Sequence, residues 1–345
     1  MKVCWITSLP PKHSGIAIYS SSLLTELHKK IRVKVIPWNY DTWFSKILSP
    51  LRNIFQLRKA LLEYDIVHVQ YILGEMMFLF LPILCALSIK KNAKIVLTCH
   101  EDYSNLAFSK VIMLFHDMFY QCADLIMVHT SNHKMLLAQR LHKRTIIIPF
   151  GTQPQPISSA GNNSTILLPG FINPWKGHDI AVKAVSIVRK AIPKVQLVIV
   201  GKAYDKIFTE KVRQMIKSLG LTGNIQMRTE FVSDDEYKAL LRNSYIAILP
   251  YRRTTMSAVL SDVVGNTLPC IISDLPTFRE YTRNKAIYCK PNDHVDLAKK
   301  IVLLLKDSQL RKMMANNFKN LVKEYGWTKV ASQTLKQYIV LLGKS

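Results

Sequence analysis

The sequence is short of acidic residues. Its 345 residues contain 23 Asp and Glu against 47 Lys and Arg, which gives a formal net charge of +24 at pH 7. Such a balance favours a partner that carries phosphate, or an anionic membrane surface. Nucleic acid is the competing explanation, but zinc-finger spacings, RNP-like aromatic motifs and a separate basic arm are all absent. We therefore expect no specific nucleic-acid partner.

Cysteine is also scarce, and low-complexity tracts are missing. The six cysteines are widely spaced and form no Cys-x-x-Cys motif. Several lie in apolar runs, where cysteine behaves as a small buried hydrophobe. A reduced, cytoplasmic setting therefore fits better than a disulfide framework. The apolar run at residues 2–6 is too short for a secretory signal peptide and is predicted to be a strand.

Apolar residues, by contrast, make up 49% of the chain and occur in short runs with helical patterns between them. A chain of this length and composition can fill the cores of two domains. The runs of the first half are continuous and rich in β-branched residues, as the buried strands of a parallel sheet require. Strands are predicted at residues 3–8, 33–37, 66–70, 95–99, 125–129 and 146–149, with helices at 18–29, 106–122 and 131–141.

A second series follows residues 151–164, a predicted linker rich in Gly, Pro, Ser, Asn and Gln. Its strands are predicted at 165–168, 196–200, 225–227, 245–249, 270–273 and 286–288, and its helices at 177–191, 205–219, 234–243 and 294–306. Two such series predict an α/β protein with two Rossmann-like domains and a ligand in the cleft at the carboxyl ends of their strands. We place these domains at residues 1–152 and 153–326, with a final helical segment at 327–345.

Two segments of the first half have an unusual pattern. Residues 44–62 combine Lys and Arg with an apolar face made by Leu51, Ile54, Phe55 and Leu62. They are predicted to form either a basic amphipathic helix in a membrane interface or a core helix with solvated basic residues. Residues 76–89 form an almost unbroken apolar run that is short for a spanning helix. We expect a buried helix there, with partial membrane insertion as the alternative.

Candidate site residues of the first half stand at the ends of predicted strands. Gly15 lies between the first strand and the first helix, where a bare backbone lets a ligand approach closely. His100, followed by Glu101, closes another strand and is a candidate hydrogen-bonding or acid–base group. His68 has a similar place. The alternatives are a plain turn glycine and histidines whose ring nitrogens are bonded to nearby backbone.

The second half has the same arrangement. Gly170 forms a close turn after a strand, and Lys176 stands just before a helix, where it can reach the phosphates of a ligand. Residues 245–274 form a strand–loop–helix–strand unit, whose helix N-terminus offers unpaired N–H groups to an anion. A surface lysine and an ordinary crossover with a satisfied cap are the alternatives.

The order and spacing of these segments resemble the retaining glycosyltransferases of family 4. The resemblance rests on SGIAIY (14–19), YDIVHVQY (64–71), TCHE (98–101), PWKGH (174–178), VGK (200–202), residues 250–280 and YGWT (325–328). It spans essentially the whole chain, and the ordered set is more specific than any single motif. The resemblance implies a GT-B fold, in which two Rossmann-like domains face a cleft and the last helix crosses back onto the first domain.

The resemblance also implies roles for individual residues. The second domain would hold a nucleotide-sugar donor, such as a UDP- or GDP-sugar, and the first a glycan, lipid-linked or other hydroxyl acceptor. Lys176 at the donor diphosphate and His100 near the reacting sugar carbon are the implied catalytic residues. The implied donor-binding set is Gly15, Gly170, Lys176, Thr254, Thr255, Ser257, Ala258, Val259 and Asp262, and the implied acceptor side is His68 and Glu101.

Two positions depart from the family pattern. Many members carry a Glu-x7-Glu pair where this sequence has Thr254 and Asp262, and Phe171 stands where many have a phosphate-binding Arg. Lys176 is then the main cation. The sequence has no Asp-x-Asp metal motif, so we expect transfer without a metal or another cofactor, by a cytoplasmic enzyme or one peripheral to the inner face of the membrane. The alternative is a catalytically degenerate GT-B protein that binds a nucleotide sugar or a partner without transfer.

Overall fold

Two units share the chain, residues Met1–Gly151 with Trp327–Ser345, and residues Thr152–Gly326. The computed structural model describes residues 1–10, 14–37, 55–71, 92–100, 120–137, 139–155 and 165–343. The predictions for residues 44–54, 76–89 and 106–119, for Glu101 and for part of the linker lie outside these ranges.

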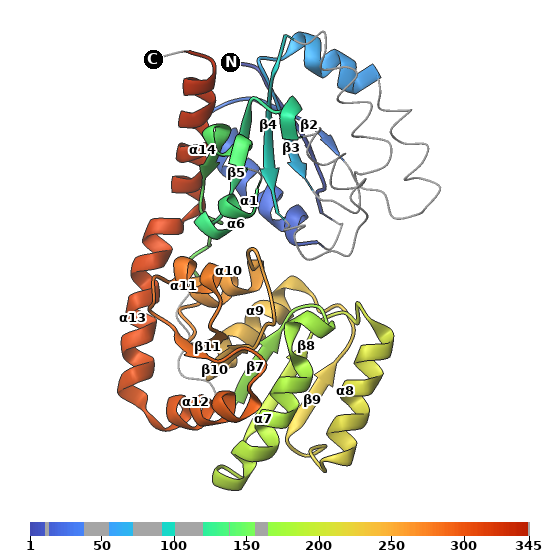
Figure 1. The fold of residues 1–345 in the computed structure, drawn as a ribbon, viewed down its shortest axis with the longest axis vertical. Helices are drawn as coiled ribbons and strands as arrows, with labels where there is room; N and C mark the ends of the chain where they lie inside the picture. The colour runs from blue at the N-terminus through green and yellow to red at the C-terminus, as the bar shows by residue number, and fades with distance from the viewer. Residues whose placement is uncertain are drawn as a thin grey trace. The chain divides into compact units, whose positions relative to one another are not determined.

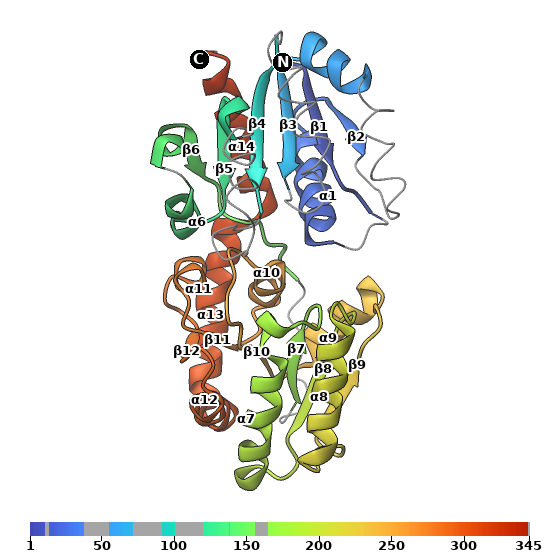
Figure 2. The same ribbon diagram turned by 45° about the vertical axis from the view of Figure 1, so that its right-hand side comes forward.

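The first unit is built on a six-stranded parallel sheet with the order β2-β1-β3-β4-β5-β6. Most of its strands lie side by side in Figure 2. The strands are β1 (Val3–Thr7), β2 (Val33–Pro37), β3 (Ile66–Tyr71), β4 (Lys94–Cys99), β5 (Leu125–Val128) and β6 (Thr145–Ile147). All of β1 and β5 and nearly all of β4 are buried, as the continuous apolar runs predicted. The prediction of a parallel α/β sheet is confirmed.

Local capping explains where the helices of this unit begin and end. Helix α1 (Gly15–His28) begins three residues before the prediction, because the Ser14 side chain accepts a hydrogen bond from Ala17 N. The helix predicted at 131–141 is instead α6 (Ser131–Leu136) followed by the 3₁₀ helix η1 (Gln139–Arg144). Leu137 is extended and ends α6. Helix α14 (Trp327–Leu341) packs beside α1 (Figure 1).

Residues 55–63 are helical, but the predicted apolar face is not the packed one. Leu57, Ala60 and Leu61 are buried and join the core of the first unit. Phe55 and Leu62, which were assigned to the apolar face, are 78% and 43% exposed. The core is filled from the other side of the helix, so these two side chains point to solvent.

The second unit has its own six-stranded parallel sheet, in the order β12-β11-β10-β7-β8-β9. Its strands are β7 (Thr165–Pro169), β8 (Gln196–Val200), β9 (Ile225–Arg228), β10 (Ile246–Leu249), β11 (Cys270–Ser273) and β12 (Ile287–Cys289). Each predicted strand is present, with ends shifted by one residue at most. Since the two central strands β10 and β7 are neighbours, the loops that follow them lie at the same edge of the sheet.

Helices cover this sheet (Figure 1). They are α7 (His178–Ala191), α8 (Lys206–Ser218), α9 (Asp234–Asn243), α10 (Ala258–Gly265), α11 (Pro276–Thr282), α12 (His294–Lys306) and α13 (Ser308–Tyr325), with the 3₁₀ helix η2 (Pro174–Lys176) before α7. Helix α11 was not predicted. It is short and starts at a proline, so it has too few turns to show an apolar period.

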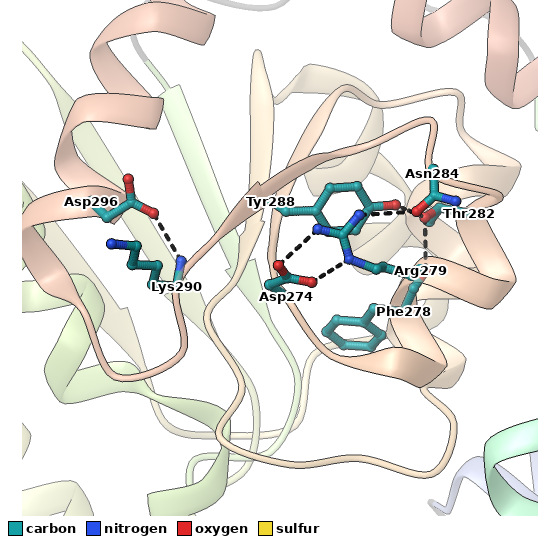
Figure 3. A network of polar contacts seen from close by, with 8 residues as sticks. All are labelled: Asp274, Phe278, Arg279, Thr282, Asn284, Tyr288, Lys290 and Asp296. Carbon is teal, nitrogen blue, oxygen red and sulfur yellow. Dashed lines mark hydrogen bonds and ion pairs between the residues drawn. The ribbon is translucent and has the colours of Figure 1, made fainter.

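A polar network fixes α11 between β11 and β12 (Figure 3). The Arg279 guanidinium donates to both carboxylate oxygens of Asp274 and, at 3.0 Å, to Asn284 Oδ1. It also lies 4.3 Å from the centroid of the Tyr288 ring. The Tyr288 hydroxyl is hydrogen-bonded to Thr282 Oγ1. These contacts supply the tertiary support that a two-turn helix needs.

Among the described residues, no helix is both long enough and apolar enough to cross a membrane.

Candidate functional site

Lys176 stands in a sharply defined turn at the carboxyl end of β7. The strand ends at Pro169, and the next residue, Gly170, has a φ of +111° and donates its N–H to Val200 O at 2.9 Å. The Asn173 side chain accepts from Lys176 N at 3.1 Å and so caps η2. Gly177 then adopts a left-handed conformation with a φ of 71°, after which α7 begins. Glycine suits both positions, because positive φ is strained for other residues.

The Lys176 ammonium group lies close to the backbone of Gly170. Its Nζ donates to the Tyr251 hydroxyl at 2.6 Å and lies 4.0 Å from the centroid of the same ring. A Cβ added to Gly170 would come within 3.5 Å of Lys176 Nζ and 3.2 Å of Val259 Cγ2. Gly170, Lys176 and Val259 were singled out from the sequence, and the structure brings them to one place.

The N-terminus of α10 contributes to the same place. Ser257 is the N-cap, and its side chain accepts from Leu260 N at 3.2 Å. Ala258 and Val259 form the first turn, whose remaining N–H groups are the natural partners of an anion. In the preceding loop, Thr254 Oγ1 donates to Met256 O at 2.8 Å, so this hydroxyl stabilises the loop itself. A phosphate bound here would meet a cation and a helix N-terminus together.

Asp262 lies further along α10, close to Tyr237 of α9. The Tyr237 hydroxyl donates to Asp262 Oδ2 at 3.1 Å. Burial is the main cause that raises the pKa of Asp262 to about 7, while the hydrogen bond from Tyr237 works in the opposite direction. A carboxyl group of this kind changes its charge near neutral pH and so can either donate to or accept from a ligand hydroxyl.

In the first unit, a chain of hydrogen bonds joins the predicted histidines. His68 Nδ1 contacts the Tyr338 hydroxyl, and His68 Nε2 lies 2.7 Å from Thr98 Oγ1 and 3.3 Å from the amide group of Gln70. The other end of that amide lies 2.8 Å from His100 Nε2. The chain therefore links α14 to the carboxyl ends of β3 and β4.

The chain continues from His100 to His129 at the end of β5. His100 Nδ1 lies 3.2 Å from His129 Nε2, and His129 Nδ1 lies 3.0 Å from Ile148 O. Burial lowers the pKa of His68 to about 3, that of His129 to about 4, and that of His100 well below 6.5. All three rings are therefore neutral at neutral pH.

The backbone carbonyl of Ile148 determines which atom is the donor in each hydrogen bond of this histidine chain. Because a carbonyl only accepts, His129 donates from Nδ1 and, being neutral, accepts at Nε2 from His100 Nδ1. His100 Nε2 is then an acceptor. The structure has Gln70 Oε1 facing His100 and Gln70 Nε2 facing His68, so the neutral arrangement requires this amide to be flipped, with its NH₂ towards His100 and its oxygen towards His68. With the opposite amide orientation, the His100–His129 pair would need an extra proton. The buried environment favours the neutral arrangement.

Comparisons with known proteins identify the family. The model of glycosyl transferases group 1 matches residues 150–321, and that of glycosyltransferase family 4 matches residues 13–155. The chain belongs to the GT4-type glycosyltransferases. The resemblance drawn from the ordered motifs is confirmed.

Two relatives with similar sequences are named glycosyltransferases. The chain is 24% identical over 300 residues to an uncharacterized glycosyltransferase of Methanocaldococcus jannaschii, covering 84% of this chain and 80% of the relative. It is 24% identical over 336 residues to the GalNAc-alpha-(1->4)-GalNAc-alpha-(1->3)-diNAcBac-PP-undecaprenol alpha-1,4-N-acetyl-D-galactosaminyltransferase of Campylobacter jejuni, covering 94% of this chain and 87% of the relative.

Solved structures support the fold of this glycosyltransferase. Anabaena HepE in complex with UDP-glucose superimposes with a TM-score of 0.78 at 15% sequence identity, covering 98% of this chain and 99% of the other. Together with the two parallel sheets, this similarity confirms the predicted GT-B fold.

The predicted site residues of the glycosyltransferase fall into one group in each unit. In the second unit, Gly170, Lys176 and the start of α10 converge. In the first unit, His68 and His100 are joined through Gln70, and Gly15 is the first residue of α1. Glu101 lies outside the described residues. Among the described ranges, no group of three or more His, Cys, Asp or Glu side chains forms a metal-binding arrangement.

Sequence reasoning gave no role to several residues that shape these groups. His129 directly follows β5, as His100 directly follows β4. This repeated position after a strand is the signal in the sequence that could have identified His129. Tyr251 follows a strand in the same way, but its contact with Lys176 joins residues 75 positions apart. Tyr237 lies in a helix, with nothing in the sequence to link it to Asp262.

Proposed function

We propose that this glycosyltransferase is a retaining, metal-independent hexosyltransferase that uses a nucleotide-sugar donor held by the second unit. The observation that carries the proposal is the convergence of Lys176 Nζ, the bare backbone of Gly170 and the N-terminus of α10. Together they form a cationic, N–H-rich surface that suits a diphosphate. Thr254, Thr255, Ser257 and Asp262 belong to the same loop and helix and complete the proposed donor site.

Charge stabilisation is the main chemical task of this site. As the bond between the anomeric carbon and the diphosphate oxygen breaks, negative charge grows on the diphosphate. Lys176 and the amides of the first turn of α10 stabilise it from fixed positions. The acceptor hydroxyl attacks the same face of an oxocarbenium-like sugar and gives its proton to the departing phosphate oxygen. No protein nucleophile takes part in this route.

His100 would act in this scheme as a neutral group near the reacting sugar. Both of its ring nitrogens have protein partners, and its pKa lies well below 6.5. A neutral imidazole does not add to the positive charge that develops on the sugar. We propose a positioning and hydrogen-bonding role for His100 and an acceptor-side role for Glu101. His68 is fully buried, so the acceptor-side role we propose for it is indirect and acts through Gln70 and His100.

The test uses the purified chain with a panel of UDP- and GDP-sugars. Thermal shift reveals which donor binds, because a ligand of the native state raises its apparent stability. Product NMR then gives the anomeric configuration, and inversion would contradict the proposed route. Lys176→Ala should lower transfer by about 10²- to 10³-fold, as loss of a charge-stabilising group does elsewhere. Lys183→Ala, on the exposed side of α7, is the matched control. Unchanged activity in EDTA is expected.

The acceptor is proposed to be a lipid-linked or glycan hydroxyl. The name of the Campylobacter relative describes a polyprenyl-diphosphate-linked substrate. The exposed side of residues 55–63 supports a peripheral membrane location, since Phe55 and Leu62 are exposed there beside the exposed Arg58 and Lys59. Binding to vesicles should rise with anionic lipid content and fall in Phe55→Asp. Equal binding to neutral and anionic vesicles would contradict this location.

The second candidate is a protein that binds a donor without transferring it. The Thr254 hydroxyl, at the position of an expected Glu, donates to Met256 O within its own loop, and a hydroxyl cannot supply the negative charge of a glutamate. If no donor is turned over with any acceptor but one donor still raises the melting temperature, this candidate replaces the enzyme.

A further inference from the structure

We propose that Pro250, Tyr251 and Arg252 form a clamp that positions Lys176 for the diphosphate. The inference rests on the proposed function, because it takes Lys176 as the phosphate-binding cation. The clamp is the segment directly after β10, and it contacts the turn 174–179 that follows β7. In this proposal Tyr251 and Arg252 act on the donor site through Lys176, in addition to their structural contacts.

Tyr251 acts on the ammonium group itself. Its ring is buried, with 1% of the residue exposed, and packs 5.4 Å from the ring of Phe278. The hydroxyl is therefore fixed, and it accepts the hydrogen bond from Lys176 Nζ. A lysine side chain has four flexible bonds and loses entropy when it is ordered on a ligand. Holding Nζ in place beforehand reduces that loss when the diphosphate binds.

Arg252 acts on the backbone of the turn. Its N–H donates to Trp175 O at 2.8 Å, and its guanidinium donates to Pro174 O. The same guanidinium forms a bidentate ion pair with Asp179 in the first turn of α7, at 3.0 and 2.7 Å. The pair is partly buried, with side-chain exposures of 32% and 19%. Arg252 thus holds both ends of the turn that carries Lys176.

Pro250 closes the remaining side. A Cβ added to Gly177 would lie 2.0 Å from Pro250 O, so the residue after Lys176 packs directly on this carbonyl. Strands β7 and β10 are already paired within the sheet. The contacts of the clamp lie beyond that pairing, which joins Ile246 to Ile166 and Ala247 to Leu167. They meet on the short turn that carries Lys176.

The experiment measures how each variant binds a nucleoside diphosphate compared with the nucleoside alone. UDP with uridine, and GDP with guanosine, are titrated by calorimetry into wild type, Tyr251→Phe and Lys176→Ala. Tyr251→Phe removes only the hydroxyl and is expected to weaken the diphosphate by about tenfold while the nucleoside changes less than twofold. Arg252→Lys should act in the same direction, because lysine cannot replace a bidentate guanidinium.

Tyr245→Phe is the matched control. The Tyr245 hydroxyl also accepts from a cation, the guanidinium of Arg311, whose carbon lies 4.1 Å from the ring centroid, but Tyr245 stands at the opposite end of β10. This variant should lose stability without losing discrimination between UDP and uridine. Equal weakening of diphosphate and nucleoside in Tyr251→Phe would overturn the clamp and leave Tyr251 as a packing residue.

The two proposals fail in different ways. If Lys176→Ala weakens the diphosphate and Tyr251→Phe does not, the clamp is overturned and the phosphate site stands. If Lys176→Ala has no effect on UDP or GDP, the phosphate site is overturned, and the clamp with it.

Discussion

Asp262→Asn should change how the stability of the second unit depends on pH. The pKa of Asp262 is raised from 3.8 to about 7, first of all by burial. Each pKa unit corresponds to about 1.4 kcal/mol, so ionising Asp262 costs the folded state up to about 4 kcal/mol more than the unfolded chain. Its side chain keeps partial contact with solvent, which makes this figure an upper limit.

The sign follows from the raised pKa. Well below pH 3.8, Asp262 is protonated in both states and contributes no penalty. As the pH rises towards 7, the unfolded chain releases this proton and the folded chain retains it, so the free energy of unfolding of the wild type falls. Asparagine keeps the acceptor for the Tyr237 hydroxyl but cannot ionise. The variant should therefore gain stability relative to wild type as the pH rises.

The assay is urea unfolding followed by circular dichroism at intervals between about pH 4.5 and 8. The free energy of unfolding is taken from the transition whose urea midpoint the variant shifts. Histidine protonation changes the stability of wild type and variant alike. The difference between their free energies of unfolding therefore reports on Asp262. Asp274→Asn is the control. Asp274 is exposed and its pKa is lowered by the hydrogen bond from Arg279, so it stays ionised in the folded state over the assayed range. The difference in free energy of unfolding between wild type and Asp274→Asn should therefore stay nearly constant over that range. A difference between wild type and Asp262→Asn that stays constant over the range would refute the reasoning.

Three further predictions concern the turn and the histidine chain. Gly177→Ala should lower the free energy of unfolding by about 1–3 kcal/mol, because of its left-handed φ and the contact with Pro250 O; an unchanged melting temperature would contradict this. The pKa of His68 is lowered by burial, so its contribution to stability is lost as the pH falls from about 6.5 towards 3. In His68→Gln the free energy of unfolding should therefore fall less steeply as the pH is lowered. An equally steep fall in the variant would count against this prediction. Tyr338→Phe removes the hydroxyl that donates to His68 Nδ1, and ¹⁵N NMR should then show changed ring-nitrogen shifts at both His68 and His100; a change at His68 alone would break the proposed chain.

The strands could be predicted from the sequence because parallel strands buried on both faces need continuous apolar runs. Residues 270–273 show this well, since every one of them is buried. Residues 55–63 show the limit of the method. Periodicity indicates that a helix has an apolar face, but which face packs depends on the sheet beneath it, and here Leu57, Ala60 and Leu61 fill that space.

The candidate site could be predicted in part for a similar reason. Gly170 and Lys176 stand at strand ends, where ligands of such sheets bind, so their position in the sequence identifies them. The Arg252–Asp179 pair was not predictable, because its partners are 73 positions apart and meet only through the pairing of β10 with β7.

The histidine chain of the first unit has a consequence for its C-terminal helix. In the neutral arrangement with the Gln70 amide flipped, the row anchored on the Ile148 carbonyl has a single polarity, and every donated proton points the same way from Tyr338 towards that carbonyl. No single ring can move its proton from one nitrogen to the other alone. The hydrogen bond to its neighbour would then hold either two protons or none. The tautomer of His100 is therefore a collective property of the row, and a residue of α14, more than 230 positions along the chain, helps to determine which nitrogen carries the proton.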